Sequence, residues 1–566
     1  MNTRARFPIE GVNYRCAAEV DELYAKNALV RFTVGDVLRQ AALEFPDKLY
    51  VISADGQLTF SELDRKSEAL AASFASLGLE PGDRALFQMG TVIETIIALF
   101  GCYKAGVLPV CTLPQHRELE IGQLARLSKP RAFFVQADFS PSFDQVGFAR
   151  RMAADYGIEF VIAARGGAGD SVHSLEQLID GSNYEEACLR IASIAIDPED
   201  VLSFQLSGGS TGVPKIIPRM HGEYLAQARS WAQLHEITEK DVCLWPLPLI
   251  HNAAMVLIVL PALVKRSTIV IQERFDMMAF LEAIERFGVT YAGSIGPIAP
   301  RLLEYPDLTK HNLSTLRMFF ALDRADALER HIGIPAANMY GITEGLLTSS
   351  RPDDVEAARH DTIGRPSSEF EEVRVLVPGS EALVPVGQEG ELCFRGPSSL
   401  RGYYNAPDIN AESFTKDGFF RSGDLVREIS IDGQSYYAFS GRLKDNISRG
   451  NEKFAAEEVE RLIVRHPSVM DAKVVAMPDR IFGEKACAFI IPNPGVTCPT
   501  TGELGLFLAA LGLAKYKLPE RVEAVSTFPV TRVGKVDKKA MREMIAAMVA
   551  AEYASATAYG PQATTA

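Results

Sequence analysis

Short apolar runs alternate with helical patterns along the first half of the chain, and this alternation restricts the fold more than any other feature. The runs include residues 85–88, 132–135, 160–163 and 268–271. Their length and spacing are typical of buried parallel strands that are joined by crossover helices. The sequence therefore predicts an α/β fold with helices layered on sheets.

The pattern changes near Arg365, where short strand-like runs alternate with glycine and proline. Segments 371–376 and 389–394 predict a smaller antiparallel or barrel-like unit. After Arg442 the alternation of helices and strands returns on a reduced scale, which predicts a separate C-terminal domain of about 120 residues. We expect an N-terminal domain over 1–442, a C-terminal lid domain over 443–550 and a disordered tail over 551–566.

Charge and composition exclude several classes of protein. The chain carries 58 Lys+Arg and 72 Asp+Glu, a formal net charge of −14, which disfavours nucleic acid as a partner. Its longest apolar stretches are interrupted by charges or are too short to span a bilayer, so no membrane partner is expected. There is no apolar leader pattern and the 8 cysteines form no CxxC pair, so we expect a cytoplasmic protein with reduced thiols.

The most informative motif is a glycine-rich loop that follows the apolar run 201–204. It reads Leu-Ser-Gly-Gly-Ser-Thr-Gly-Val-Pro-Lys from Leu206 to Lys215. Glycines let backbone amides turn toward an anion, while hydroxyls and a lysine add donors and a positive charge. Val-Pro separates the last glycine from the lysine, so this is not a Walker loop. We expect a phosphate-binding loop formed by Ser207, Gly208, Gly209, Ser210, Thr211, Gly212 and Lys215.

This loop and further motifs downstream resemble the adenylate-forming superfamily, which includes acyl-CoA ligases, peptide-synthetase adenylation domains and luciferases. The motifs are YGITE at 340–344, RSGD at 421–424, GRLKD at 441–445 and GK at 534–535. The resemblance implies a large N-terminal region of mixed α/β subdomains with a barrel-like part, plus a small mobile α+β C-terminal domain. It also implies a reaction in which a carboxylate and ATP give acyl-AMP and pyrophosphate, and a thiol then replaces AMP.

The resemblance assigns the catalytic roles. Lys535 corresponds to the cation that bridges the carboxylate and the α-phosphate while charge redistributes in the transition state. Glu344 corresponds to a carboxylate that holds Mg²⁺ together with the nucleotide phosphates, and Thr343 to a phosphate-contacting hydroxyl. ATP and Mg²⁺ are therefore the expected cofactors.

Further residues correspond to the nucleotide site of the family. Tyr340, followed by Gly341, matches the ring that stacks on adenine. Asp424 matches the acid that accepts both ribose hydroxyls, for which one carboxylate is well suited. Arg442 would then support the ribose or a phosphate from the hinge side.

Family members rotate the C-terminal domain between the two half-reactions, and Lys444 falls at the hinge position. Lys535 would serve adenylation, whereas the loop 449–453 would enter for thioester formation and line the thiol's tunnel with Gly450. Many relatives have a second glycine where this chain has Asn451. The sequence therefore does not determine the shape of the thiol tunnel.

The acid site resembles the aryl-acid branch, whose members activate 2,3-dihydroxybenzoate or salicylate. The matching segments are 113–117, 216–221 and 248–252, which ends in His251 and Asn252. In that branch the asparagine bonds the ring's ortho substituent, and a buried amide without a partner would cost about 1 to 3 kcal/mol. An asparagine satisfied by nearby backbone is the alternative.

The chain also departs from that branch. Residues 253–257 are Ala, Ala, Met, Val and Leu, so no obvious hydroxyl receives a ring 3-hydroxyl and 2,3-dihydroxybenzoate is disfavoured. Leu257 belongs to this apolar wall, and Leu322 would narrow the pocket. Asp323 could accept a hydrogen bond from adenine or from a substrate amine. Our hypothesis is an ortho-substituted benzoate such as anthranilate or salicylate.

Several questions stay open at this stage. CoA and an aryl carrier protein present the same phosphopantetheine thiol, so the catalytic residues do not separate these acceptors. A ligase for a non-ortho-substituted or aliphatic acid and a noncatalytic ATP-binding relative are the alternatives. A homodimer is common in the resembling branch and is therefore a possible state.

Overall fold

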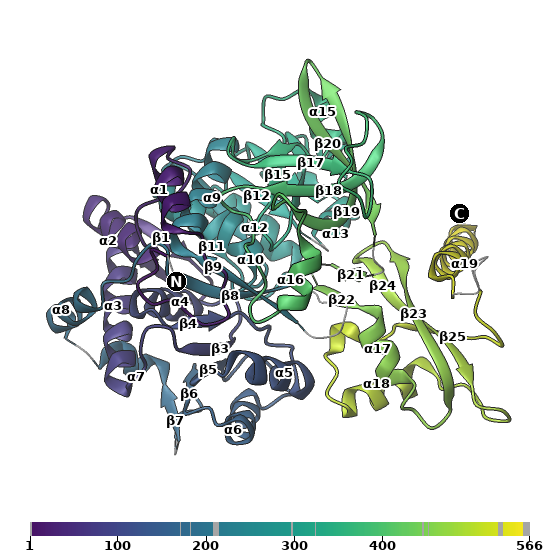
Figure 1. Ribbon diagram of the computed structural model, residues 1–566, viewed down its shortest axis with the longest axis horizontal. Helices are drawn as coiled ribbons and strands as arrows, with labels where there is room; N and C mark the ends of the chain where they lie inside the picture. The colour runs from purple at the N-terminus through teal and green to yellow at the C-terminus, as the bar shows by residue number, and fades with distance from the viewer. Residues whose placement is uncertain are drawn as a thin grey trace, which may run out of the picture.

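The computed structural model describes residues 3–169, 171–181, 183–207, 214–295, 298–322, 324–443, 446–450, 452–529 and 536–558. Within these ranges the strands form four sheets, two large ones in the body of the molecule and two smaller ones (Figure 1). The predicted α/β layering is confirmed, and the expected short runs are strands.

The first large sheet has 7 strands in the order β7-β6-β5-β3-β4-β8-β9. All neighbours are parallel except β8 and β9, which pair antiparallel on either side of the glycine-rich loop. Its strands are β3 (Arg84–Gln88), β4 (Leu108–Val110), β5 (Ala132–Gln136), β6 (Phe160–Ala164), β7 (Val172–Ser174), β8 (Val201–Ser207) and β9 (Lys215–Met220).

The second large sheet has 9 strands in the order β16-β15-β14-β13-β12-β10-β11-β1-β2. Strands β10 to β14 run parallel, so their carboxyl ends open toward the same edge. The strands are β1 (Leu49–Ile52), β2 (Gln57–Thr59), β10 (Val242–Trp245), β11 (Thr268–Ile271), β12 (Tyr291–Ser294), β13 (Met318–Ala321), β14 (Ala336–Gly341), β15 (Leu347–Ser349) and β16 (Arg365–Pro366).

Helices cover and separate these sheets. The largest apolar core joins helices α3, α4, α9 and α11 to one face of the first sheet and to both faces of the second, and a second core joins α5 and α6 to the other face of the first sheet. The helices of this body are α1 (Ala17–Ala25), α2 (Val34–Glu44), α3 (Phe60–Leu77), α4 (Ile93–Ala105), α5 (Glu118–Ser128), α6 (Gln145–Tyr156), α7 (Leu175–Asp180), α8 (Tyr184–Ile194), α9 (His221–Leu234), α10 (Asn252–Ala254), the π-helix η1 (Met255–Val259), α11 (Leu260–Lys265), α12 (Met277–Phe287), α13 (Ile298–Leu303), the 3₁₀-helix η2 (Leu308–Lys310), α14 (Ala325–Ile332), α15 (Glu356–Asp361) and α16 (Pro407–Ser413).

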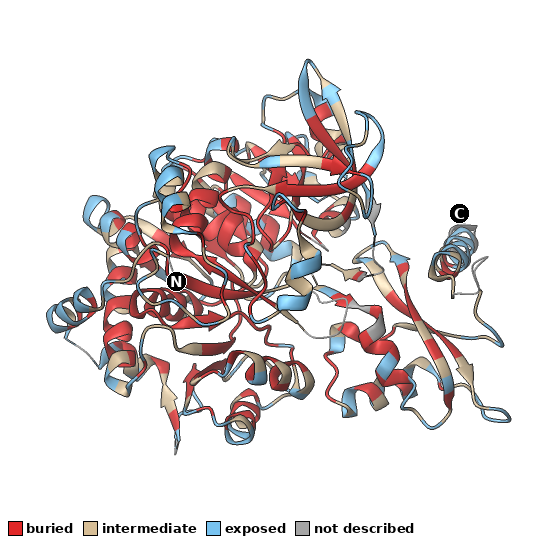
Figure 2. Ribbon diagram, in the orientation of Figure 1, coloured by how far each residue is buried: buried red, intermediate tan, exposed pale blue. Residues whose placement is uncertain are grey.

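Strand β5 shows how the sequence builds both cores. Because successive side chains of a strand point to opposite faces, Ala132 and Phe134 enter the first core while Phe133 and Val135 enter the second. Every residue of this strand is buried, which explains why its sequence is apolar without alternation from Ala132 to Val135. Figure 2 shows the same burial across both large sheets, with exposure on the outer helices.

The unit predicted after Arg365 is an open antiparallel sheet in the order β17-β18-β19-β20. Its strands are β17 (Glu372–Leu376), β18 (Glu389–Arg395), β19 (Phe420–Ile431) and β20 (Gln434–Arg442). This sheet lies above the body in Figure 1, and its last strand, β20, leads into the C-terminal unit.

The C-terminal unit has a sheet of 5 strands in the order β22-β21-β24-β23, with β25 paired to β24. Its elements are β21 (Asn446–Arg449), β22 (Glu452–Ala455), α17 (Ala456–Ile463), β23 (Val469–Asp479), β24 (Gly483–Pro492), α18 (Thr501–Ala510), the 3₁₀-helix η3 (Lys515–Lys517), β25 (Arg521–Ala524) and α19 (Lys538–Ala558). Strands and helices alternate here on the reduced scale that the sequence indicates.

The end of the chain corrects one expectation. Helix α19 continues to Ala558, so the first part of the segment 551–566 is helical rather than a disordered tail. Met541, Ile545 and Val549 anchor this helix in a small core with strands β23 and β24. Among the described residues, no helix combines the length and the apolar character that crossing a bilayer requires.

Candidate functional site

A cavity of about 1020 Å³ lies where the body of the molecule meets the C-terminal unit. The strands β8, β12, β13 and β14 end at it, which is where α/β sheets commonly bind ligands. The cavity brings together these predicted residues: Ser207, Lys215, His251, Asn252, Leu257, Leu322, Tyr340, Gly341, Thr343, Glu344, Asp424 and Gly450.

Other predicted residues cannot be placed in this way. The side chain of Arg442 lies outside what the structure describes, although its backbone pairs with Asp424 in the sheet. The residues outside the described ranges are Gly208, Gly209, Ser210, Thr211, Gly212, Asp323, Lys444, Asn451 and Lys535. Their predicted roles stay predictions.

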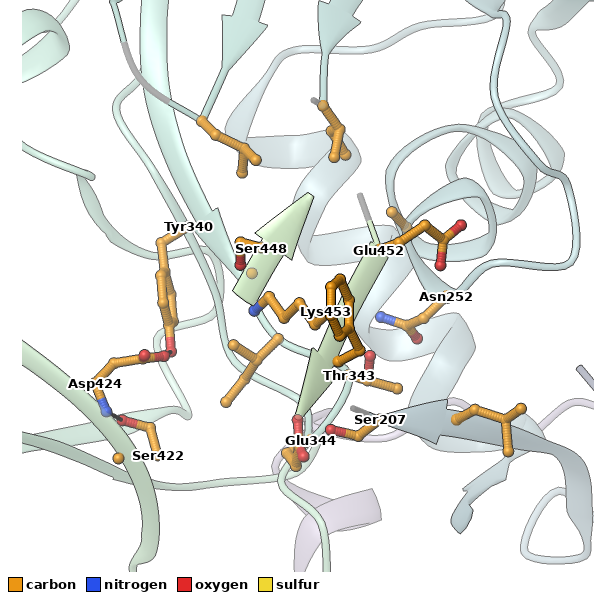
Figure 3. A pocket seen from close by; sticks show the side chains of 18 of the residues that line it. Ser207, Asn252, Tyr340, Thr343, Glu344, Ser422, Asp424, Ser448, Glu452 and Lys453 are labelled. Atoms are coloured by element: carbon orange, nitrogen blue, oxygen red, sulfur yellow. Dashed lines mark hydrogen bonds between the residues drawn. The ribbon is translucent and has the colours of Figure 1, made fainter. Parts of the chain in front are cut away.

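Tyr340 and Asp424 lie together on one side of the cavity. The Tyr340 hydroxyl donates to Asp424 Oδ2 at 2.7 Å, and both side chains are buried (Figure 3). The Tyr340 ring stacks on Phe439 with centroids 6.3 Å apart. The hydrogen bond fixes the carboxylate, while the stacked aromatic pair offers a flat surface that suits a purine base.

Glu344 is oriented by a residue that the sequence motifs did not reveal. The Tyr403 hydroxyl donates to Glu344 Oε1 at 2.7 Å, and the Lys215 ammonium lies 4.4 Å from the centroid of the Tyr403 ring. Burial, followed by the Glu344 charge, raises the pKa of Tyr403 well above its ordinary value, so this hydroxyl keeps its proton. The carboxylate thus has one oxygen fixed by a neutral donor.

This arrangement fits one particular kind of metal site. Within the described ranges no group of three or more His, Cys, Asp or Glu side chains could hold a metal ion. Mg²⁺ is commonly held by one or two carboxylates plus substrate phosphates rather than by an all-protein cage. The buried Glu344 shares the cavity with the Lys215 ammonium, and this arrangement fits a Mg²⁺ ion that arrives with a nucleotide.

A buried arginine braces the loop that carries Thr343 and Glu344. Arg219 Nη1 donates to the backbone carbonyl oxygens of Ser398 at 3.0 Å and Thr343 at 3.3 Å, and Arg219 pairs with Glu223 at 3.0 Å. Gly345 follows with φ of +129°, and a Cβ there would lie 1.9 Å from Ser398 O. Only glycine fits this close approach of two backbones.

Another side of the cavity begins at an unusual helical segment. His251 caps helix α10, since its Nδ1 accepts the Ala253 amide at 3.2 Å. The helix continues as the π-helix Met255–Val259, a form that is frequent at functional sites. Burial, followed by the Lys453 charge, lowers the pKa of His251 to about 4, so its imidazole is neutral near pH 7.

The Asn252 amide oxygen is satisfied by a side chain rather than by nearby backbone. The hydroxyl of Tyr224, on helix α9, donates to Asn252 Oδ1. Asn252 lines the cavity, as do Ala253, Val256 and Leu257 of the adjoining apolar wall. This side therefore presents one amide beside an apolar wall.

The hairpin of β21 and β22 closes the cavity from the C-terminal unit. Gly450, Glu452 and Lys453 line it, and the Lys453 side chain reaches between Tyr340 and Asn252 (Figure 3). Beneath the hairpin, Lys517 pairs with both oxygens of Glu458 at 3.0 Å. It also approaches Glu120 Oε1, on helix α5 of the body, at 3.3 Å.

Comparison with known proteins assigns the chain to a family. Residues 38–404 match the family model described as AMP-binding enzyme, and residues 458–535 match the AMP-binding enzyme C-terminal domain. The chain belongs to the AMP-binding enzyme family. The predicted membership of the adenylate-forming enzymes is thereby confirmed.

Relatives with similar sequences share nearly the whole chain. A 2,3-dihydroxybenzoate-AMP ligase of Bacillus subtilis is 35% identical over 93% of this chain and 96% of its own length. A salicylyl-CoA synthase / salicylate adenylyltransferase of a Streptomyces species is 33% identical over 90% and 93%. The solved structure of Mycobacterium smegmatis MbtA superposes with a TM-score of 0.70 at 33% identity, covering 94% of this chain and 98% of that one.

The AMP-binding motifs identify residues that touch the cavity but miss those that orient them. Tyr403, Arg219 and Tyr224 act on the site through Glu344, the Thr343 carbonyl and Asn252. Their sequence separations from these partners reach 124 residues, so no local pattern predicts the pairs. One partial signal exists, since Arg219 is a charged residue inside the apolar strand β9.

Removing the Tyr403 hydroxyl should disturb Glu344 without changing its charge. A hydrogen bond to a charged group contributes roughly 1.5 to 3 kcal/mol, so we expect Tyr403→Phe to weaken binding of ATP with Mg²⁺ about tenfold. Equilibrium titration of the nucleotide at fixed Mg²⁺ measures this effect. The phenylalanine ring keeps the contact with Lys215.

Tyr404→Phe is the matched control. Tyr404 is also buried, and its ring packs on Phe204 at 4.7 Å, away from Glu344. Its variant should bind the nucleotide as the unmodified protein does. Equal losses in both variants would show that tyrosine packing, rather than the bond to Glu344, is responsible.

Proposed function

We propose that this enzyme activates an ortho-substituted benzoate, such as anthranilate or salicylate, to aryl-AMP with release of pyrophosphate. It then transfers the aryl group to the phosphopantetheine thiol of CoA or an aryl carrier protein. One observation carries this proposal. The nucleotide-side residues Tyr340, Asp424 and Glu344 share a single cavity with an amide, Asn252, set in an apolar wall.

The nucleotide would bind with adenine against Tyr340 and the ribose at Asp424. The loop from Ser207 to Lys215 would hold the phosphates, with Thr343 as a further hydroxyl donor. Glu344 would hold Mg²⁺, which when bound neutralises phosphate charge. Lys535 would bring the cation that lets an anionic carboxylate approach the α-phosphate.

The aryl acid would lie between Asn252 and the apolar wall. Relatives named for 2,3-dihydroxybenzoate and for salicylate both support an aromatic acid. Ala253, Val256 and Leu257 offer no side-chain hydroxyl to a ring 3-hydroxyl, which favours an acid with a single ortho substituent.

The thiol step would use the arrangement that the structure describes. The hairpin with Gly450 and Lys453 already lies in the cavity, so this arrangement suits attack by a thiol rather than adenylation. For adenylation the C-terminal domain, residues 443–550, would turn about Lys444 and bring Lys535 to the body, residues 1–442.

Acid-dependent exchange between ATP and pyrophosphate tests the proposal. We expect the highest exchange rate with salicylate or anthranilate, and lower rates with 2,3-dihydroxybenzoate, benzoate, a medium-chain fatty acid and amino acids. CoA consumption in a second assay then separates the two acceptors. Exchange that peaks on a fatty acid would contradict the acid assignment, and a lack of exchange with every acid would contradict the activity.

Lys535→Ala should separate the two half-reactions. Loss of one preorganised charge slows adenylation by about 10² or more, while thioester formation from supplied aryl-AMP stays near normal. Single-turnover measurements of each step provide the comparison. Lys539→Ala is the matched control, because Lys539 is exposed and pairs weakly with Glu543 at 4.0 Å. Equal slowing of both steps in Lys535→Ala would contradict the assignment of Lys535.

A further inference from the structure

The acid side of the cavity has a fixed hydrogen-bond polarity. Tyr224 is fully buried on helix α9, with its ring 4.6 Å from the Arg219 guanidinium. Its hydroxyl donates to Asn252 Oδ1 from behind the cavity wall. The Asn252 nitrogen then remains on the cavity side, near Lys453 in Figure 3.

Hydrogen-bond chemistry decides the orientation of this amide. Burial raises the pKa of Tyr224 well above its ordinary value, so the hydroxyl stays protonated and needs an acceptor. Within the described residues its hydrogen-bond partner is Asn252 Oδ1. A reversed amide would present its N–H groups to the hydroxyl and leave the buried O–H proton without an acceptor, which is unfavourable.

The exposed half of the amide is therefore a donor. Asn252 Nδ2 carries two N–H groups and no lone pair that accepts, so it recognises an acceptor on the ligand. The adjacent wall adds no competing polar group at Ala253, Val256 or Leu257. A ligand atom at this position must offer a lone pair.

Ortho-substituted benzoates differ in what they offer there. In salicylate the hydroxyl proton bonds to the neighbouring carboxylate, so the oxygen turns its lone pairs outward as an acceptor. In anthranilate one amine N–H bonds to the carboxylate and the other points outward as a donor. The salicylate oxygen suits the Asn252 Nδ2 donor, whereas the outward N–H of anthranilate would face that donor with another donor.

We propose that Tyr224 is a positioning residue that fixes Asn252 as a donor and thereby selects ortho-hydroxybenzoates over ortho-aminobenzoates. This inference rests on the proposed function, because it concerns the acid site of the same reaction. Tyr224 acts through Asn252 and is not among the residues that line the cavity.

The test compares salicylate, anthranilate and benzoate in acid-dependent ATP–pyrophosphate exchange. The unmodified enzyme should prefer salicylate over anthranilate by about tenfold or more in kcat/KM, the scale of one unpaired donor. Tyr224→Phe frees the Asn252 amide to turn. The ratio of kcat/KM for salicylate to kcat/KM for anthranilate should therefore fall several-fold, while kcat/KM for benzoate changes little. A general loss of packing would lower kcat/KM for all three acids alike and leave the ratio of salicylate to anthranilate unchanged.

Tyr103→Phe is the matched control. Tyr103 is equally buried, and its hydroxyl contacts Met255 Sδ at 3.6 Å rather than Asn252. Its variant should keep the ratio of the unmodified enzyme. A ratio that falls equally in both variants, or that stays constant in Tyr224→Phe, would overturn the role of Tyr224.

Asn252→Asp provides a second variant that does not depend on the fold tolerating Tyr224→Phe. Its carboxylate still accepts a hydrogen bond from the Tyr224 hydroxyl and can also accept one from the outward amine of anthranilate. The preference for salicylate over anthranilate should therefore reverse. Titration of the isolated acids, followed calorimetrically, reads the same preference without turnover. Retained preference for salicylate in Asn252→Asp would overturn the inference.

The outcomes also separate this inference from the proposed function. Exchange with anthranilate equal to or above salicylate in the unmodified enzyme overturns the polarity argument but leaves aryl-acid activation intact. Exchange on an aliphatic acid alone, or on none of the acids, overturns both.

Discussion

One buried ammonium group, Lys517, holds the two parts of the chain in the arrangement that closes the cavity. Burial alone would lower the pKa of Lys517, but the Glu120 and Glu458 carboxylates outweigh it and keep that pKa above its ordinary value. Removing one partner of a buried ion pair typically costs about 3 to 5 kcal/mol. The position of the β21–β22 hairpin therefore depends on this shared cation.

Around Lys517 the contact between the two parts is largely polar, with Leu119 of the body packed against the core of the C-terminal unit. His116 Nε2 and the Tyr516 hydroxyl lie 3.2 Å apart, and the Ala514 amide donates to Glu120 Oε1 at 3.2 Å. Polar contacts can exchange for water when two domains separate, whereas a large apolar interface would expose its surface. An interface of this kind suits a unit that holds one position for the thiol step and leaves it for adenylation.

The sequence predicts the fold well because its signals are local. The apolar run 132–135 depends only on neighbours in the chain, and it forms the buried strand Ala132–Gln136 as expected. The motif residues Tyr340, Glu344 and Asp424 likewise meet in one cavity, as the resemblance implies.

What the sequence misses are pairs that only the tertiary structure creates. Tyr403 reaches Glu344 across 59 residues, and Lys517 reaches Glu120 from the other part of the chain. Neither side chain carries a local pattern that distinguishes it from a surface residue. The polarity of Asn252 has the same origin, because Tyr224 sets it from the neighbouring helix α9.

The most direct test of this arrangement is the single-turnover rate of each half-reaction in Glu120→Gln, with Glu118→Gln as control. Glu118 lies in the same helix but is exposed, with Arg151 at 3.6 Å as its partner. If the Lys517 contact holds the thiol-transfer arrangement, Glu120→Gln slows thioester formation from supplied aryl-AMP about tenfold or more and leaves adenylation unslowed. Unchanged thioester formation, or equal slowing of both steps, would contradict it.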